Sequence, residues 1–370
     1  MELTKVDFAL SRKRLSWKDL MAQGAMDALI TLLLSQLHHV TNLVLGPMFT
    51  FETALLRQLF YAALFKQADH ELPTYQHLRV LCLNFDARLG RTIHALRSID
   101  LLPWFHLPAV REFSLISSMP TTWDEIPMQT PASSLLTMLH LTAVEPKHLG
   151  HLLTMTPKLK KLRYDWYYRS GVHLGRPDEG SVWVNLDGIG RALVCVRESL
   201  EELVITSKCS IEVDNEYDFL DFERTLSRIV ELDCLKALQI PLPFLSGNFD
   251  ARGAIAEEDV IPRNLESLTI TDDVLLEWPW QPEWYDTSVS SALERWLRNL
   301  KRLKTEPVLK TLVLKEVVRD WSPVMKEELS QICQHYDLDF RVIGFRKKGI
   351  ERVNRPVEFS RGVHSIIPFP

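Results

Sequence analysis

Two histidines and a run of carboxylates are the residues in this sequence that come nearest to metal chemistry. His148 and His151 stand three apart in a segment with a helical pattern, which would place both rings on one side of a helix. No cysteine or paired carboxylate accompanies them at the spacing of a zinc site, so we interpret them as residues of a helix surface. The acidic run over residues 214–223 lacks the glycine and the closing glutamate of a calcium-binding loop. We therefore predict no metal and no cofactor.

Signatures of catalysis are also missing from the sequence. It contains no glycine-rich phosphate loop, no nucleophile elbow and no zinc-protease motif. We predict that the protein is not an enzyme.

Composition limits the partners and the cellular location that the protein can have. The net charge of -5 gives no electrostatic footprint for nucleic acid, and the longest apolar run, residues 28–34, is too short to cross a membrane. The five cysteines are scattered without a C-x-x-C pair, and no signal-peptide pattern is present. These features predict an intracellular protein of the cytoplasm or nucleus, with no nucleic acid and no membrane as partner.

An aromatic cluster lies in a segment that two prolines interrupt. It consists of Trp278, Trp280, Trp284 and Tyr285. These rings either pack over neighbouring structure, as a long loop requires, or form a partner contact, because Trp and Tyr dominate interface hot spots. We keep this loop as a secondary candidate site.

The elements that must position any site follow a six-residue repeat: apolar, two free positions, apolar, one free position, apolar. Nine copies begin at residues 40, 78, 110, 136, 159, 200, 235, 265 and 309. The last two apolar residues of each copy stand two apart, so a strand would point both to one face. This is the signature of a leucine-rich repeat, without the Asn that usually follows the strand. The steps between central apolar residues are irregular, from 23 residues (Leu139 to Leu162) to 44 (Leu268 to Leu312), against roughly 20–29 for standard repeats.

Helical patterns follow most copies of the repeat. We expect helices over residues 50–68, 92–99, 146–154, 186–199, 219–232, 288–303 and 322–336. Strand and helix in alternation predict an α/β protein: a leucine-rich-repeat-like solenoid (horseshoe) with one parallel sheet, outer helices and irregular repeat lengths. Leu338, Phe340 and Val342 would form a tenth, terminal strand.

Three segments follow from this pattern. Residues 1–36 would be an N-terminal segment with a capping helix over 18–37, whose apolar side carries Ala22, Met26, Leu29, Leu33 and Leu37. Residues 37–345 would form the irregular solenoid. Residues 346–370 would be a basic C-terminal tail, either solvated or bound to an acidic partner.

The strand positions facing the concave side favour a protein or peptide partner. Positions three, five and seven of the nine copies carry six charged residues, too few and too scattered to track phosphates: Glu112, Lys161, Arg163, Asp165, Glu202 and Lys315. The predicted site lies near the middle of the sheet. It consists of Met138, His140, Arg163, Asp165, Val204 and Gln239, with Trp166 and Tyr167 at the rim just beyond a strand.

Three passages, over residues 162–168, 186–189 with 196–203, and 261–273, resemble the leucine-rich-repeat region of filamentous-fungal F-box proteins. The resemblance implies a substrate-recognition part of a cullin-type ubiquitin ligase receptor. That family begins with an F-box near a Leu-Pro-x-Glu phrase, whereas residues 1–36 contain no proline. We therefore predict a non-enzymatic protein–protein interaction module that does not bind the ligase adaptor on its own. The alternative is a leucine-rich-repeat scaffold without a ligase link.

Overall fold

The computed structural model describes thirteen stretches of the chain: residues 17–22, 24–46, 54–65, 72–85, 103–117, 134–169, 181–210, 219–223, 226–246, 261–273, 286–303, 308–317 and 321–344. Three predicted features lie outside the described residues. These are the helix over 92–99, the aromatic loop over 278–285 and the basic tail over 346–370.

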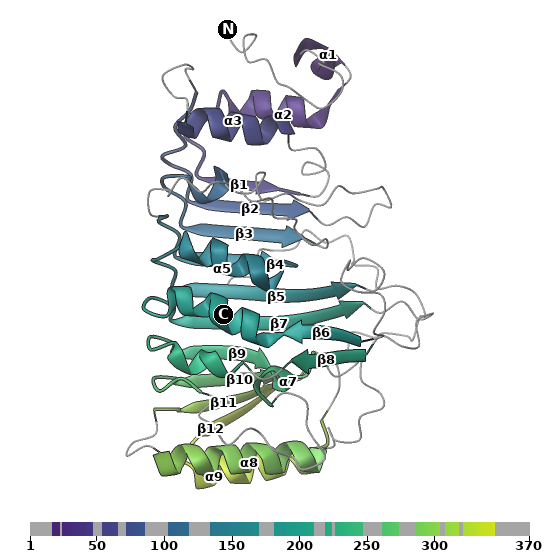
Figure 1. The fold of residues 1–370 in the computed structure, drawn as a ribbon, viewed down its shortest axis with the longest axis vertical. Helices are drawn as coiled ribbons and strands as arrows, with labels where there is room; N and C mark the ends of the chain where they lie inside the picture. The colour runs from purple at the N-terminus through teal and green to yellow at the C-terminus, as the bar shows by residue number, and fades with distance from the viewer. Residues whose placement is uncertain are drawn as a thin grey trace.

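Ten strands form one sheet in the order of the chain (Figure 1). They are β1 (Asn42–Leu45), β2 (Val80–Phe85), β3 (Glu112–Ser117), β4 (Met138–Thr142), β5 (Lys161–Arg169), β7 (Glu202–Ser210), β9 (Ala237–Pro241), β10 (Ser267–Thr271), β11 (Thr311–Lys315) and β12 (Asp339–Ile343). Every neighbouring pair in this sheet is parallel. One parallel sheet with a strand for each repeat copy and a terminal strand is therefore confirmed.

The register of this sheet follows the repeat without a slip. The central apolar residue of each copy pairs with that of the next, from Leu43 opposite Leu81 to Leu268 opposite Leu312 and Leu312 opposite Phe340. A shift by one residue would turn each strand's apolar set to the other face, so burial of these residues specifies the pairing. Leu203 and Leu268, the central apolar residues of their copies, are both completely buried.

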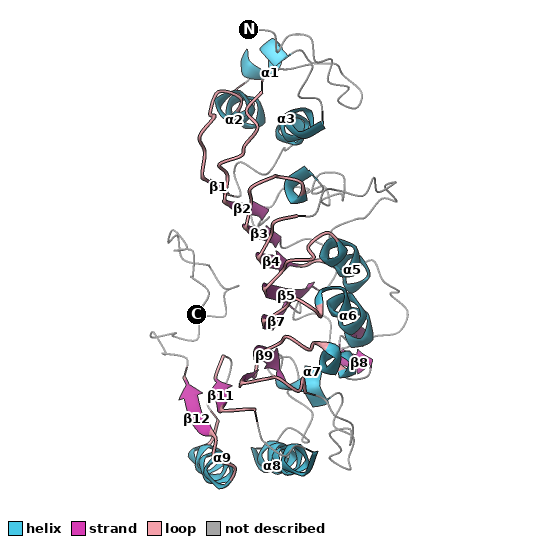
Figure 2. Ribbon diagram, turned by 90° about the vertical axis from the view of Figure 1, so that its left-hand side faces the viewer, coloured by secondary structure: helices cyan, strands magenta, loops and turns pink. Residues whose placement is uncertain are grey.

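Helices cover one face of the sheet (Figure 2). Beside the middle strands lie α5 (Pro146–Thr154), α6 (Leu186–Leu193), η3 (Val194–Val196) and α7 (Leu242–Ser246), while α3 (Ala54–Phe65) lies near β1, and α8 (Asp286–Leu303) and α9 (Pro323–His335) lie near β12. No described helix lies on the opposite side, which we call the helix-free face, and the sheet bows so that β1 and β12 are displaced toward it. Within the described residues no helix is long and apolar enough to cross a membrane.

One predicted helix is wrong. Residues 219–232 form β8 (Phe219–Glu223) and a short 3-10 helix, η4 (Ser227–Glu231). β8 pairs in parallel with β6 (Ser181–Asn185) in a separate two-stranded sheet. An aromatic-rich run suits a strand when a neighbouring strand is available. The paired residues Ser181 and Phe219 stand 38 residues apart, so no local pattern in the sequence indicates this pairing.

The N-terminal helix differs from its prediction in both extent and orientation. It divides at Gly24, whose φ of 69° ends a helix, into α1 (Trp17–Ala22) and α2 (Met26–Leu34). The predicted apolar side faces outward, with Leu33 58% exposed, while Asp27 is buried. The Asp27 carboxylate accepts hydrogen bonds from the backbone N–H groups of Leu55 (2.8 Å) and Leu56 (3.1 Å) at the start of α3. These bonds satisfy free donors of a helix N-terminus and determine which side of α2 is buried.

Candidate functional site

The helix-free face carries two adjacent rows of side chains across the middle strands. Because the strands are in register, residues at equivalent positions stand side by side. One row runs His140, Arg163, Val204 and Gln239 on β4, β5, β7 and β9. The next row contains Thr142, Asp165 and Thr206 on β4, β5 and β7. The structure thus brings together the predicted residues His140, Arg163, Asp165, Val204 and Gln239. Met138 lies on the same face of β4, two residues before His140.

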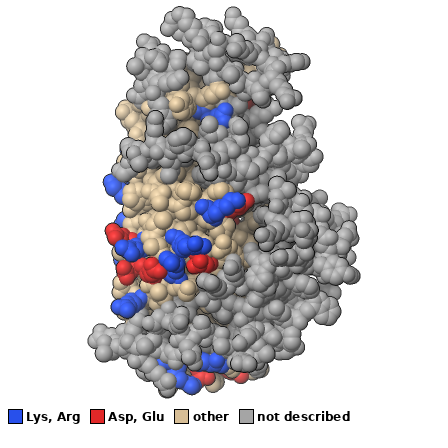
Figure 3. Space-filling view, in the orientation of Figure 1, with Lys and Arg blue, Asp and Glu red and all other residues tan. Residues whose placement is uncertain are grey.

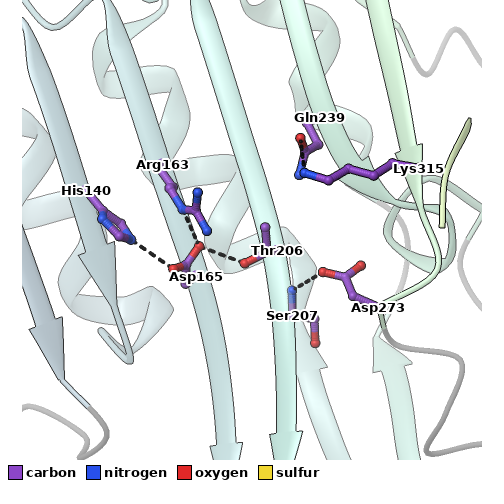
Figure 4. A network of polar contacts seen from close by, with 8 residues as sticks. All are labelled: His140, Arg163, Asp165, Thr206, Ser207, Gln239, Asp273 and Lys315. Atoms are coloured by element: carbon purple, nitrogen blue, oxygen red, sulfur yellow. Dashed lines mark hydrogen bonds and ion pairs between the residues drawn. The ribbon is translucent and has the colours of Figure 1, made fainter. Parts of the chain in front are cut away.

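Asp165 is the centre of this arrangement (Figure 4). Its carboxylate bonds to His140 Nε2 at 2.8 Å, and it accepts hydrogen bonds from Arg163 Nε at 2.9 Å and from Thr206 Oγ1 at 2.7 Å. Its side chain is 4% exposed, whereas those of His140 and Arg163 are 18% and 31% exposed. Burial by itself would raise the pKa of Asp165, but the hydrogen bonds and positive charge around the carboxylate outweigh burial and hold that pKa well below its usual range. Asp165 is therefore a buried anion that orients two more exposed side chains.

Some predicted contact residues are less accessible than the alternation suggested. Asp165 and Val204 are both buried, so they support the surface and offer little of themselves to a partner. Trp166 and Tyr167 do not follow a strand, because β5 and β7 pair over nine residues, from Lys161 opposite Glu202 to Arg169 opposite Ser210. Trp166 is only 8% exposed inside that ladder, and Tyr167 is half-buried. The prediction that these residues lie just beyond a strand is wrong, and Trp166 is too buried to form an open rim.

Lys315 belongs to the same surface, although the predicted site omitted it. It lies on β11 opposite Thr271 of β10. Its Nζ donates a hydrogen bond to Gln239 Oε1 on β9 at 3.3 Å, so the side chain crosses β10. Burial lowers the pKa of Lys315, and the nearby positive charge of Arg163 lowers it further, while Asp273 and Asp165 act in the opposite direction. The sequence did mark Lys315 as one of six charged positions of this face. Its reach toward β9 required the structure.

Asp273, two residues after the end of β10, is a second carboxylate beside this surface, and it is half-buried. Its Oδ2 accepts a hydrogen bond from Ser207 N at 2.8 Å, and its Oδ1 accepts one from Thr271 Oγ1. β7 and β9 pair only from Glu202 to Val204, so Ser207 lies beyond their ladder and the Asp273 side chain supplies an acceptor there. Burial raises the pKa of Asp273 to about 6, more than its hydrogen bonds lower it. No pattern in the sequence indicated this contact.

Most other charges of the described surface are paired. On the helix-covered face, Lys, Arg, Asp and Glu gather in a band of both signs (Figure 3). There Asp187 lies 3.2 Å from Arg191 and 3.8 Å from Arg228. On the helix-free face, Lys161 and Glu202 form an ion pair at 2.6 Å. Exposed pairs of this kind contribute roughly 0–1 kcal/mol and leave no net charge for a ligand.

The His140–Asp165 contact could orient a general base, but no hydroxyl or thiol of the described residues hydrogen-bonds to His140 as a nucleophile would. In the part of the chain that the structure describes, no group of three or more His, Cys, Asp or Glu side chains is placed to hold a metal ion. The described side chains of this face form a mixed polar and apolar surface on strands.

Fold and site together define a mixed α/β protein with a ten-stranded parallel sheet, one face of which carries helices and the other an ordered side-chain network. No protein-family model matches the sequence, and no curated protein matches it significantly.

Proposed function

We propose that the chain is a leucine-rich-repeat-like solenoid of horseshoe form, with the helix-free face as its concave surface. One strand per repeat copy, an unbroken parallel register and the bow of the sheet support this architecture. The irregular steps between copies are accommodated outside the strands, since the register stays in phase from β1 to β12.

On this scaffold we propose a non-enzymatic protein–protein interaction module that binds a protein or peptide on the concave face. The observation that carries the proposal is the buried Asp165 carboxylate holding His140 and Arg163 in fixed orientations. A partner meeting such a surface loses less side-chain entropy on binding, because the donors are already ordered. Arg is also one of the residue types enriched in interface hot spots.

The resemblance of three passages to fungal F-box proteins supports a more specific role. In that role the chain is the substrate-recognition part of a cullin-type ubiquitin ligase receptor, acting in the cytoplasm or nucleus. A leucine-rich-repeat scaffold without a ligase link is the alternative. Binding of the purified chain to the ligase adaptor separates the two roles, and we expect no binding by the chain alone because residues 1–36 lack the Leu-Pro-x-Glu phrase.

The binding face is tested with substitutions that spare the Asp165 network. Met138 and Gln239 are half-buried on the helix-free face, and Met138 makes no side-chain hydrogen bond there. A partner is first captured from the source organism and purified, and its affinity is then measured for Met138→Asp and Gln239→Ala. We expect losses of about tenfold or more, as for central interface residues. Arg191→Ala on α6 is the matched control on the helix-covered face and should leave affinity unchanged.

Substitution of the Trp278–Tyr285 segment distinguishes the secondary candidate. Suppose that Met138→Asp and Gln239→Ala keep the affinity for the partner, and that replacing Trp278, Trp280, Trp284 and Tyr285 abolishes it. The partner then binds that loop, and the concave-face proposal is wrong.

A further inference from the structure

Two cations converge on the helix-free face from opposite sides of β7. Arg163 projects from β5, and Lys315 extends from β11 over β10 toward Gln239 on β9 (Figure 4). Adjacent strands are separated by about 4.8 Å, so β5 and β9 lie about 10 Å apart with β7 between them. β7 therefore lies between the two cationic groups, with Val204 opposite Arg163 and Thr206 opposite Asp165.

Several hydrogen-bond donors of these two cations have no acceptor among the described residues. Arg163 gives its Nε to Asp165, and no described residue accepts a hydrogen bond from its two terminal amino groups. Lys315 Nζ has one neutral acceptor, Gln239 Oε1, and no carboxylate oxygen of the described residues lies within 4.0 Å of it. Among the described residues, Asp165 is the carboxylate in direct contact with Arg163, and none is in direct contact with Lys315, on which Asp273 and Asp165 act from a greater distance.

The lowered pKa of Lys315 also favours an additional anion near its ammonium group. Its pKa is lowered by burial and by the charge of Arg163, which means that the ammonium form is held at a cost. Burying a cation without a partner is unfavourable unless another group supplies the missing charge. An anion placed between the two side chains would supply it. The remaining donors of Arg163 also form a planar fork that matches a carboxylate or phosphate.

We propose that the partner presents an anionic side chain, a carboxylate or a phosphate, that binds between Arg163 and Lys315 above Val204 and Thr206. This inference rests on the proposed function, since it names the chemistry of the peptide that the concave face takes. Glu or Asp and a phosphorylated Ser or Thr are two sources of that chemistry. Asp165 is a positioning residue for the site, because it fixes the Arg163 guanidinium from beneath.

The test uses the full 370-residue chain and three fluorescent peptide pools with random flanks. The central residue is fixed as Glu, phosphoserine or Gln, and binding is followed by fluorescence anisotropy. We expect one or both anionic pools to bind about tenfold more tightly than the Gln pool, as a charge-assisted hydrogen bond implies. The pool that binds more tightly identifies the source of the anion.

Variants assign the preference to this pair of cations. Lys315→Gln should reduce the preference for an anion to less than about twofold, and Lys315→Arg should keep it, because the charge and donors remain. Lys310→Gln is the matched control: it removes one charge just before the same strand, where Lys310 is exposed and already paired with Glu266 at 2.7 Å. A second readout is the NMR titration of the Lys315 ammonium, whose pKa should rise when the anionic pool binds and stay unchanged with the Gln pool.

Equal binding of all three pools, or an anion preference that survives Lys315→Gln, overturns the anion site and leaves the concave-face proposal standing. Failure of every pool to bind overturns it too. The proposed function is judged separately, by the Met138 and Gln239 variants with the purified partner.

Discussion

Replacing Asp165 by Asn removes one negative charge from the centre of the site with almost no change in volume. The amide oxygen still accepts from Arg163 Nε and Thr206 Oγ1, but the amide nitrogen faces His140 Nε2 and cannot accept a hydrogen bond from it. Hydrogen bonds to a charged group contribute roughly 1.5–3 kcal/mol each, and breaking a fully buried ion pair costs roughly 3–5 kcal/mol. Water reaches His140 and Arg163, so we expect a loss of about 2–3 kcal/mol in the free energy of unfolding at pH 7.

The loss should depend on pH in a defined direction. The pKa of Asp165 is depressed in the folded protein, so the carboxylate stabilises the fold fully above the ordinary Asp pKa of about 3.9, and that stabilisation fades as pH falls below it. The difference between the native protein and Asp165→Asn should therefore be largest near neutral pH and shrink below about pH 4.

Urea unfolding followed by far-UV circular dichroism at pH 7, 5 and 3.5 measures this difference. Glu202→Gln is the control, because it makes the same acid-to-amide change on the same face in a more exposed pair with Lys161, and it should cost less than about 1 kcal/mol. Equal losses for the two variants, or a loss for Asp165→Asn that grows toward acid pH, would refute the role given to the buried carboxylate.

Three further predictions concern the scaffold. Leu203→Ala and Leu268→Ala should each lower the free energy of unfolding by about 2–5 kcal/mol. The control Val44→Ala, whose side chain is 54% exposed, should lower it by less than about 0.5 kcal/mol. Unchanged denaturant midpoints for both Leu variants would contradict the register. Asp27→Ala should cost about 1–2 kcal/mol in thermal unfolding, because it leaves the first turn of α3 without its acceptor, and a neutral result would mean that α2 is held by other contacts. Burial raises the pKa of Asp273 to about 6, so the free energy of unfolding should fall as pH rises from about 4 to 6. Asp273→Asn should remove that pH dependence and raise the free energy of unfolding by up to about 3 kcal/mol at pH 7.5. A steeper pH profile in the variant would argue against the raised pKa.

The Asp165 network changes what can be expected of mutations at the predicted site. Replacement of a residue on an exposed strand face usually changes stability by less than about 0.5 kcal/mol, but Arg163 and His140 do not meet that condition. Both are bonded to a buried carboxylate, so their replacement also removes compensation from Asp165. Experiments on binding therefore need Met138 and Gln239, which lie on the same face outside that network.

The sequence by itself determined the sheet. An apolar residue at the same place in nine hexads must be buried, and burial on one face of a strand permits a single register, so Leu43, Leu162 and Leu312 could be aligned without coordinates. The start of α9 is also determined by neighbouring residues in the sequence. The Ser322 hydroxyl accepts a hydrogen bond from Met325 N at 3.1 Å, and Pro323 occupies the first turn.

Tertiary structure decided the features that depend on partners far along the chain. The buried side of α2 was settled by hydrogen bonds from Asp27 to α3, 28 and 29 residues away, which outweighed the apolar stripe that periodicity favoured. Lys315 reaches Gln239 across 76 residues, and Asp273 accepts from Ser207 across 66. Hydrophobic burial is averaged over many side chains and leaves a periodic trace in the sequence, whereas a buried polar contact requires one particular pair of atoms to meet. Such a pair has no period, so the folded chain alone shows which charged groups on this face are in contact with each other.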